Sequence, residues 1–355
     1  MTTRAKVALL FGGRSGEHEV SLRSGASVAQ ALAARHDVLP VLVDKAGRWL
    51  LQDGPAPQPS GGTPVFLAPT PEDLGRLRRT ADGCELARPD VYFPVLHGTF
   101  GEDGTVQGLF ELAAVAYVGA GVVASAAAMD KEIMKALFAQ AGLPQGPYRV
   151  LRGRDGAEEA RILGDLGLPV FVKPANLGSS VAVTKVKRAE DFGRALDLAF
   201  AYDRKAMVET AIDAREIEVS VLGNERPQAS LPGEIIPDRE FYDYDSKYSA
   251  DSRTRLLIPA PLDPATVAEV QRLGNGAFRA VDASGYARVD FFLERKTGRV
   301  LLNEINTIPG FTSISMFPKM WEATGLPYPD LVARLLELGW ERHGQRARLR
   351  TDYRG

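Results

Sequence analysis

The sequence contains one cysteine, Cys84, among its 355 residues, so no disulfide can form within the chain and a reducing compartment is expected. No apolar run is long enough to cross a bilayer, and the short run after Arg4 and Lys6 does not resemble a signal peptide. A formal charge of −2 gives no electrostatic reason to bind nucleic acid or an anionic membrane. These absences indicate a cytoplasmic protein without membrane or nucleic-acid partners. The length allows two or three domains.

Residues 285–310 contain two runs rich in β-branched and aromatic residues, separated by the polar residues 296–298. We predict a β-hairpin here, with a three-residue loop that closes where Arg295 faces Arg299. Gly298 favours this loop, because its last position requires a positive φ that glycine adopts readily.

The register set by that loop brings polar side chains together. Asp290 lies opposite Glu304, and Arg288 lies opposite Asn306, all on one face of the hairpin. Two carboxylates and an amide oxygen are ligands that Mg²⁺ prefers. Because opposed carboxylates repel each other, a bound cation would compensate them. The alternative is an ordinary solvated sheet face.

Two apolar runs, residues 6–11 and 90–96, are expected to be buried parallel strands followed by polar loops. Glu17 follows the first strand and His97 follows the second. Ligands of open α/β sheets bind at the carboxyl ends of strands, so both residues are candidates for a binding site. The alternatives are a helix-start acid for Glu17 and a structural histidine for His97.

Residues 168–173 are expected to form another strand, which ends at Lys173 and leads into the small residues of NLGSSVAV. Small residues let backbone N–H groups approach phosphate oxygens, and a lysine adds positive charge. We predict a phosphate-binding flap. The alternative is an ordinary hairpin turn, because the segment does not match a P-loop.

Three other segments bear on function. One helix is expected over residues 125–140, in which Lys131 has the local signature of a solvated surface charge. The long polar and aromatic stretch 231–248 is either a closing lid or a surface excursion. A helix over residues 329–340 is expected to be followed by a charged tail.

Seven blocks of this sequence, taken together, resemble the D-alanine–D-alanine ligases of the ATP-grasp superfamily. They occur in the family's order and are LFGGRSGEHEVS, VLHGTFGEDGTVQG, MDKEIMK, VKPANLGSSVAV, EFYDYDSKY, ARVDFF and NEINTIPGFTSIS. One block alone would be weak evidence, whereas the ordered set is specific.

The resemblance implies an α/β, three-domain ATP-grasp fold. Its N-terminal parallel-sheet α/β domain would cover residues 1–122. Two ATP-binding domains with antiparallel sheets would follow: a central domain with the phosphate flap over 123–215, and a C-terminal domain with the metal site and lid over 216–355. ATP would lie between these last two domains, with two Mg²⁺ ions that Mn²⁺ can replace.

The resemblance also implies the reaction. ATP phosphorylates the carboxylate of one D-alanine, and the amine of a second D-alanine attacks the acyl phosphate to form D-alanyl-D-alanine for peptidoglycan synthesis. An acyl phosphate hydrolyses readily, so a lid that excludes water is needed. A homodimer is implied as well.

The family's roles carry over to matching residues of this sequence. The implied first-substrate residues are Glu17, His97, Ser179 and Tyr248. The implied second-substrate residues are Lys247 and Ser315. The implied ATP contacts are Lys131, Lys173, Glu209, Ile212 and Glu216. The implied metal ligands are Asp290, Glu304 and Asn306. The implied donors to the tetrahedral intermediate are Arg288 and the Gly310 N–H. For Lys131, the implied contact with ATP replaces the interpretation as a solvated surface charge.

Three rival functions are weighed against this one. A D-alanine–D-lactate ligase would have the lid tyrosine replaced, whereas Tyr248 is present. A non-catalytic nucleotide-binding protein could have lost the metal ligands and lysines, which are intact here. Another ATP-grasp ligase would not need the EFYDYDSKY lid. One departure from the family is Ala182, where the flap commonly has glycine.

Overall fold

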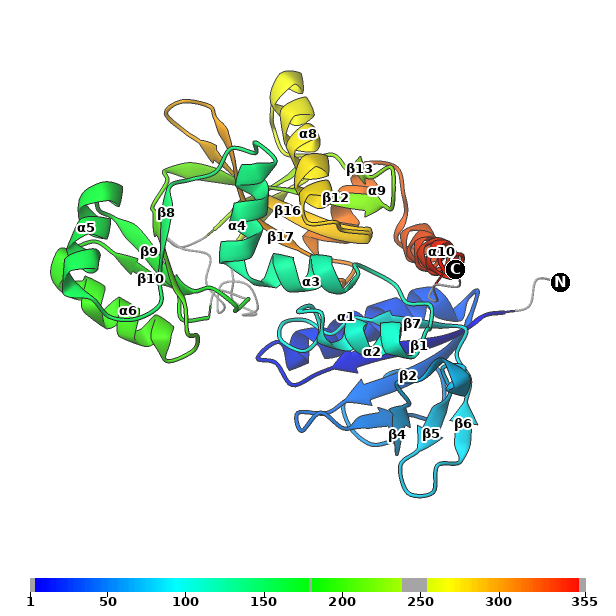
Figure 1. The fold of residues 1–355 in the computed structure, drawn as a ribbon. Coiled ribbons are helices and arrows are strands. Elements are labelled where there is room, and N and C mark those ends of the chain that lie inside the picture. Colours follow the sequence, from blue (N-terminus) through cyan, green and yellow to red (C-terminus); the bar gives the residue numbers. More distant parts are fainter. Residues whose placement is uncertain (1–3, 179–180, 238–253, 351–355) are drawn as a thin grey trace.

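The computed structural model describes residues 4–178, 181–237 and 254–350, and these residues form three sheets that follow one another along the chain (Figure 1). In Figure 1 the N-terminal sheet lies at the lower right in blue, and the four-stranded sheet lies at the left in green. The six-stranded sheet lies between them at the top. The α/β class with one parallel-containing sheet and two antiparallel sheets is confirmed.

The N-terminal sheet has seven strands in the order β6-β5-β4-β3-β2-β1-β7. The strands are β1 (Lys6–Gly12), β2 (Asp37–Val43), β3 (Trp49–Leu51), β4 (Thr63–Leu67), β5 (Leu77–Arg79), β6 (Glu85–Ala87) and β7 (Val91–Pro94). Only β1, β2 and β7 pair in parallel, and the other strands extend the sheet as an antiparallel meander. The apolar run of β1 is fully buried because helices cover both faces of the sheet there.

The helices on this sheet come from both ends of the chain. They are α1 (His18–Ala33), α2 (Thr105–Leu112) and α10 (Tyr328–Arg346), and a short 3₁₀ turn, η1 (Pro71–Asp73), precedes β5. Leu331 and Leu335 of α10 share a core with Leu9 of β1 and Val28 of α1. The helix predicted to end at residue 340 is longer in the structure, where α10 continues to Arg346. Arg342 holds this last part in place by donating a hydrogen bond to the Gly119 carbonyl.

The four-stranded antiparallel sheet has the order β10-β9-β11-β8. Its strands are β8 (Tyr148–Leu151), β9 (Val170–Pro174), β10 (Thr184–Val186) and β11 (Ala206–Thr210). The helices that share its core are α5 (Gly156–Leu166) and α6 (Phe192–Phe200), the second preceded by η2 (Ala189–Asp191). Strand β9 carries Lys173 and ends at the predicted phosphate flap.

The six-stranded sheet has the order β15-β14-β12-β16-β17, with β13 beside β12. Its strands are β12 (Ala214–Gly223), β13 (Gln228–Ala229), β14 (Gly233–Ile236), β15 (Arg255–Leu257), β16 (Gly285–Glu294) and β17 (Val300–Asn306). The helices that pack on it are α3 (Val122–Met129), α4 (Lys131–Gln140), α8 (Pro264–Ala280) and α9 (Met316–Ala323).

The single helix predicted over residues 125–140 is wrong, because the chain forms two helices there. Asp130 has extended backbone angles, φ −85° and ψ 101°, and separates α3 from α4. Its side chain accepts hydrogen bonds from the N–H groups of Glu132 and Ile133. Aspartate is a favoured N-cap residue because it satisfies such donors, so it begins a new helix.

The predicted hairpin is present, but its loop differs from the prediction. Leu293 pairs with Val300, one residue away from the register in which Arg295 would face Arg299. A β-bulge at Asn303 then adds a residue to β17 and restores the predicted pairs further along. Asp290 therefore does lie opposite Glu304, and Arg288 opposite Asn306.

Candidate functional site

A cleft of about 1490 Å³ lies between the loops of the N-terminal sheet and the two antiparallel sheets. Every predicted site residue that the structure describes lines it: Glu17, His97, Lys131, Lys173, Glu209, Ile212, Glu216, Arg288, Asp290, Glu304, Asn306, Gly310 and Ser315. Ser179, Lys247 and Tyr248 fall outside the described residues. Positions that are hundreds of residues apart in sequence therefore converge on one cavity.

The hairpin contributes a charged patch to the floor of the cleft. The Arg288 guanidinium donates two hydrogen bonds to the Asp290 carboxylate, at 2.7 and 2.6 Å. The Asn306 amide donates to the same carboxylate at 3.1 Å. Burial lowers the pKa of Arg288, but the charges of Asp290 and Glu218 outweigh it and hold that pKa well above its ordinary value. A permanent positive charge thus lies beside the predicted metal ligands.

The donor set of this patch fits Mg²⁺ in kind. It offers two carboxylates, those of Asp290 and Glu304, together with the amide of Asn306. Elsewhere in the described chain, as here, no group of three or more His, Cys, Asp or Glu side chains is arranged to hold a metal ion. The predicted site therefore has two carboxylates and depends on the amide oxygen of Asn306 for a third protein ligand.

Buried Lys135 and partly buried Lys173 flank the partly buried Glu209 on the wall of the cleft. Lys173 Nζ lies 2.5 Å from Glu209 Oε2, and Lys135 Nζ lies 2.9 Å from Glu209 Oε1. Burial raises the pKa of Glu209, but the two lysines overcome it and lower that pKa to about 2. Burial likewise lowers the pKa of Lys173, and the charges of Glu209 and Glu304 reverse this into a net rise. Glu209 and Lys173 are therefore both charged near neutral pH.

Sequence reasoning missed Lys135, whose side chain is only 3% exposed. It lies one helical turn after Lys131 on α4, so the four-residue spacing was a signal that both lysines share one face. Lys131 is not a solvated surface charge either. Its Nζ donates to the Leu177 carbonyl at 2.6 Å and lies 3.9 Å from Glu304 Oε2.

The segment that joins the two antiparallel sheets forms another part of the wall. Ile212 lies between β11 and β12, and Glu216 lies on β12 with β14 and β16 as its neighbours. A β-carbon at Gly146 would lie 2.8 Å from Ile212 Cδ1, so the chain approaches Ile212 closely at that point. This edge of the cleft combines Ala211, Ile212 and Ala214 with the charged Glu209 and Glu216.

The loops that follow β1 and β7 close the other end of the cleft. Glu17 precedes α1, and its carboxylate lies close to two glycines. A β-carbon would lie 2.8 Å from Glu17 Oε2 at Gly98 and 3.3 Å from it at Gly178. Gly178, in the segment that leads into the predicted flap, therefore also lies near Glu17.

His97 is buried and held on both ring nitrogens. Nδ1 lies 2.8 Å from the Ile308 carbonyl, which can only accept, so Nδ1 carries the proton. Nε2 then accepts from the Ser24 hydroxyl at 2.9 Å. Burial lowers the pKa of His97, which keeps the ring neutral. This histidine therefore joins the N-terminal part of the chain to the segment after β17.

Glu102 makes the same connection and was not among the predicted site residues. Its carboxylate accepts the Gly98 N–H at 2.7 Å and the Ile308 N–H at 3.2 Å. Burial and the charge of Glu17 raise the pKa of Glu102 to about 8. Its place five residues after His97 on the same loop was the available signal.

Gly310 and Ser315 lie at the entry to α9. The Ser315 hydroxyl accepts the Thr312 N–H at 3.1 Å, and a β-carbon at Gly310 would lie 3.2 Å from it. On the flap side, Ala182 has a φ of +56°, a conformation that glycine adopts more readily than alanine. The departure from the family pattern at this position therefore carries backbone strain.

Known protein families and relatives match this chain over most of its length. Residues 6–120 match the family described as D-ala D-ala ligase N-terminus, and residues 137–337 match D-ala D-ala ligase C-terminus. The chain is 51% identical to a D-alanine–D-alanine ligase of Heliobacterium modesticaldum, covering 98% of this chain and 97% of that protein.

Two solved structures are also similar. One is the D-alanine–D-alanine ligase from Coxiella burnetii, with a TM-score of 0.85 and 38% identity over 97% of this chain and 96% of that one. The other is the VanG D-Ala:D-Ser ligase from Enterococcus faecalis, with a TM-score of 0.84 and 31% identity over 95% of this chain and 100% of that one.

Proposed function

This chain belongs to the D-alanine–D-alanine ligase family, and we propose that it joins two D-alanine molecules at the expense of ATP, for the synthesis of peptidoglycan precursors. One observation supports this function above the others. The residues that the resemblance assigns to ATP, metal and substrate line a single cleft wherever the structure describes them.

The proposed first step transfers the γ-phosphoryl group of ATP to a carboxylate oxygen of the first D-alanine, and ADP leaves. Lys131 and Lys173 would hold the phosphates, because both side chains line the cleft and are mostly shielded from solvent, at 11% and 12% exposed. Glu209, Ile212 and Glu216 would hold the nucleoside along the segment that joins the two antiparallel sheets. When bound at Asp290, Glu304 and Asn306, Mg²⁺ supplies the charge that offsets repulsion between phosphate oxygens and the attacking carboxylate.

In the proposed second step the amine of the second D-alanine attacks the acyl carbon, loses a proton, and displaces phosphate. Glu17 would hold the ammonium of the first D-alanine, with His97 beside it in the pocket. Arg288 and the Gly310 N–H would donate to the oxyanion of the tetrahedral intermediate. Preorganised donors of this kind are typically worth about 3 kcal/mol each. Ser315 would face the carboxylate of the second substrate, and Ser179, Lys247 and Tyr248 complete the proposed set.

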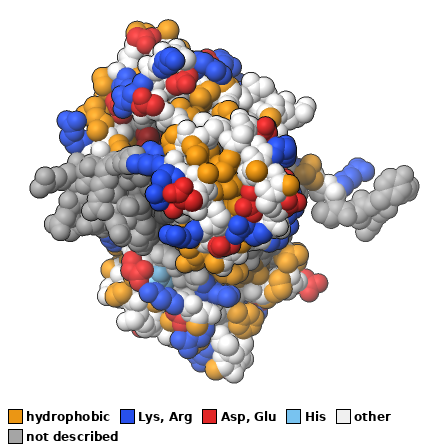
Figure 2. Space-filling model, turned by 90° about the vertical axis from the view of Figure 1, so that its left-hand side faces the viewer, with side chains coloured by type: hydrophobic (Ala, Val, Ile, Leu, Met, Phe, Trp, Pro, Cys, Tyr) orange, Lys and Arg blue, Asp and Glu red, His pale blue; other side chains and the backbone are white. Residues whose placement is uncertain are grey.

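Further parts of the proposal concern the whole protein. We propose a cytoplasmic homodimer that uses two Mg²⁺ ions, which Mn²⁺ can replace. Helices long and apolar enough to span a membrane are absent from the described segments. Figure 2 shows acidic and basic side chains interspersed on the displayed face, in keeping with no nucleic-acid partner. The division at residues 1–122, 123–215 and 216–355 stays a prediction; α3 and α4 share the core of the six-stranded sheet.

The experiment that tests the function is phosphate release with ATP and Mg²⁺, with each candidate substrate supplied alone or beside D-alanine. D-alanine alone should trigger release, and mass spectrometry should find D-alanyl-D-alanine. D-serine and D-lactate, each supplied with D-alanine, test the rival second substrates. Release with L-alanine but not with D-alanine would contradict the proposal, and a product made mainly with D-serine or D-lactate would reassign the second substrate.

A further inference from the structure

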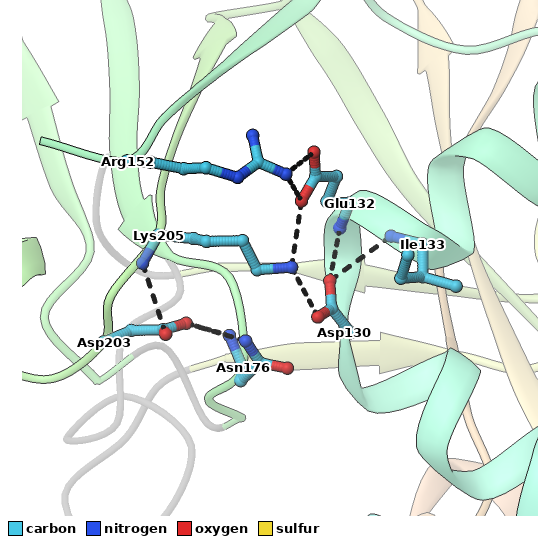
Figure 3. Close-up of polar contacts among 7 residues, drawn as sticks. All are labelled: Asp130, Glu132, Ile133, Arg152, Asn176, Asp203 and Lys205. Atoms are coloured by element: carbon cyan, nitrogen blue, oxygen red, sulfur yellow. Dashed lines mark hydrogen bonds and ion pairs between the residues drawn. The ribbon is translucent and has the colours of Figure 1, made fainter.

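A buried ionic network lies just outside the cleft lining, between α4 and the start of β11 (Figure 3). The side chain of Lys205 is only 3% exposed, and its Nζ lies 2.5 Å from Asp130 Oδ2 and 2.9 Å from Glu132 Oε2. Arg152 contacts Glu132 from the solvent side, at 2.7 and 2.9 Å, and its own side chain is 60% exposed. Nothing in the proposed reaction uses these four residues.

The two oxygens of Asp130 have separate tasks. Oδ1 caps the first turn of α4 by accepting the N–H groups of Glu132 and Ile133, while Oδ2 accepts from Lys205. Burial raises the pKa of Asp130, but the contact with Lys205 outweighs it and the pKa is lowered. A buried ammonium is costly without partners, so the position of Lys205 depends on where α4 begins.

The same network reaches the two lysines proposed to hold the ATP phosphates. Lys131 directly follows Asp130, and its N–H donates to the Ala175 carbonyl at 3.0 Å. The Ala175 N–H in turn donates to the Lys205 carbonyl at 3.1 Å. Ala175 comes two residues after Lys173. Lys205 therefore holds the start of α4 with its side chain and the end of β9 with its backbone.

Asp203 secures the chain that enters the flap. Its Oδ2 accepts the Asn176 N–H at 2.7 Å and the Asn176 side-chain amide at 2.9 Å, as Figure 3 shows. Its Oδ1 accepts the Lys205 N–H at 3.3 Å. Ala175 and Asn176, the first two residues after β9, are thus tied to the segment 203–205.

We propose that Lys205 is a positioning residue for the nucleotide phosphates, because it fixes the separation between Lys131 on α4 and Lys173 on β9. The inference rests on the proposed function, in which these two lysines hold ATP. Without the ammonium of Lys205, Asp130 and Glu132 repel each other and the start of α4 is no longer tied to β11. The start of α4, which carries Lys131, and the end of β9, which carries Lys173, are then no longer held at a fixed separation. The D-alanine pocket does not depend on this contact.

The test compares Lys205→Met with Arg152→Met as the matched control. Arg152 contacts the same Glu132 but does not reach Asp130. For each variant we would measure the affinity for AMP-PNP with Mg²⁺ by calorimetry, the KM values for ATP and D-alanine, and the thermal unfolding midpoint. We expect Lys205→Met to weaken AMP-PNP binding and raise the KM for ATP by about 10-fold or more, as is typical when supporting contacts of a site are lost. The KM of Lys205→Met for D-alanine should stay near the wild-type value. In Arg152→Met, the affinity for AMP-PNP and the KM for ATP should also stay near the wild-type values.

A double variant, Asp130→Asn with Lys205→Met, separates positioning from stability. Asparagine still caps α4, and Glu132 keeps Arg152 as its partner, so no buried charge is left unpaired. The unfolding midpoint should recover while the affinity for AMP-PNP stays low.

Recovery of both quantities in the double variant, or an unchanged affinity in Lys205→Met, would overturn the inference. If Lys205→Met does not fold, the affinity of the double variant for AMP-PNP is the quantity that tests the inference. A wild-type protein that binds AMP-PNP but releases no phosphate with D-alanine would contradict the proposed function and leave this test intact.

Discussion

At the scale of single residues, the facing carboxylates Asp290 and Glu304 are the groups whose charge matters most to the proposed chemistry. Asp290 is held by Arg288, whereas Glu304 has Lys131 at 3.9 Å. Removing one charge should weaken metal binding more than substrate binding. We therefore expect Glu304→Gln to lower kcat by at least about 10–100-fold, the loss typical even of outer-shell changes at metal sites. The measurement is phosphate release across a Mg²⁺ titration.

The control for this variant is Glu294→Gln on the same hairpin. Glu294 ends β16 next to the loop and does not line the cleft. Its variant should turn over at the wild-type rate at every Mg²⁺ concentration. Near-normal turnover of Glu304→Gln at low Mg²⁺ would show that the hairpin does not hold the metal.

Glu102 should make stability depend on pH in the neutral range. Burial and the charge of Glu17 raise its pKa from 4.5 to about 8, so the folded protein keeps a proton that the unfolded chain releases. The free energy of unfolding should therefore fall as pH rises between these two values, by up to about 1.4 kcal/mol per pH unit for one proton. The measurement is urea unfolding at several pH values.

Glu102→Gln should remove this contribution and flatten the pH profile. Glu72→Gln, a change at an exposed glutamate of the same sheet region, should leave the slope as it is in the wild type. An unchanged slope in Glu102→Gln would mean that another group takes up the proton.

At the scale of elements, the loop between β7 and α2 shapes the pocket around Glu17. Gly98 has a φ of +77°, and a β-carbon there would lie 2.8 Å from Glu17 Oε2. We expect Gly98→Ala to cost roughly 1–2 kcal/mol in backbone strain. It should also displace Glu17, which raises the KM for D-alanine by about tenfold if about 1.4 kcal/mol of binding is lost. Steady-state kinetics with each substrate varied in turn measures this.

Gly142→Ala is the matched control for that loop. Gly142 has a similar φ of +69°, but no atom lies within 4 Å of the added β-carbon. It should lose comparable stability without any change in the KM for D-alanine. Equal kinetic effects of the two variants would show that Gly98 acts through general strain.

At the scale of the whole molecule, α10 ties the N-terminal sheet to the six-stranded sheet. The Arg342 guanidinium lies 3.9 Å from the centre of the Tyr117 ring and donates to the Gly119 carbonyl at 2.5 Å. It also donates to the Ser284 hydroxyl at 3.0 Å, just before β16. Burial lowers the pKa of Arg342. These contacts explain why the helix extends beyond its predicted end.

We expect Arg342→Ala to lower the free energy of unfolding by about 2 kcal/mol or more, since it removes several part-buried hydrogen bonds and a cation–π contact. Arg334→Ala is the control on the same helix. Arg334 pairs only with Glu337 and Glu341 among the described residues and is 39% exposed, so its loss should cost less than about 1 kcal/mol. Denaturant unfolding of both variants measures the difference. Equal costs would show that α10 does not join the two parts.

Local chemistry along the chain determined much of this protein. The apolar strands 6–11, 90–96 and 168–173, the two runs of the hairpin and the polar ends of the strands follow from alternation, β-branched residues and glycine at the turns. These features depend on neighbours in sequence, so the sequence was sufficient to predict them.

Only the tertiary structure decided which distant groups meet. The bulge at Asn303 and the burial of Lys135 depend on what packs against each segment. The role of Glu102 also depends on a distant contact. Its partner Ile308 lies 206 residues away, so the sequence did not predict Glu102 as a site residue. A side chain's charge and burial are set by the surroundings that folding brings to it, and no local pattern contains that information.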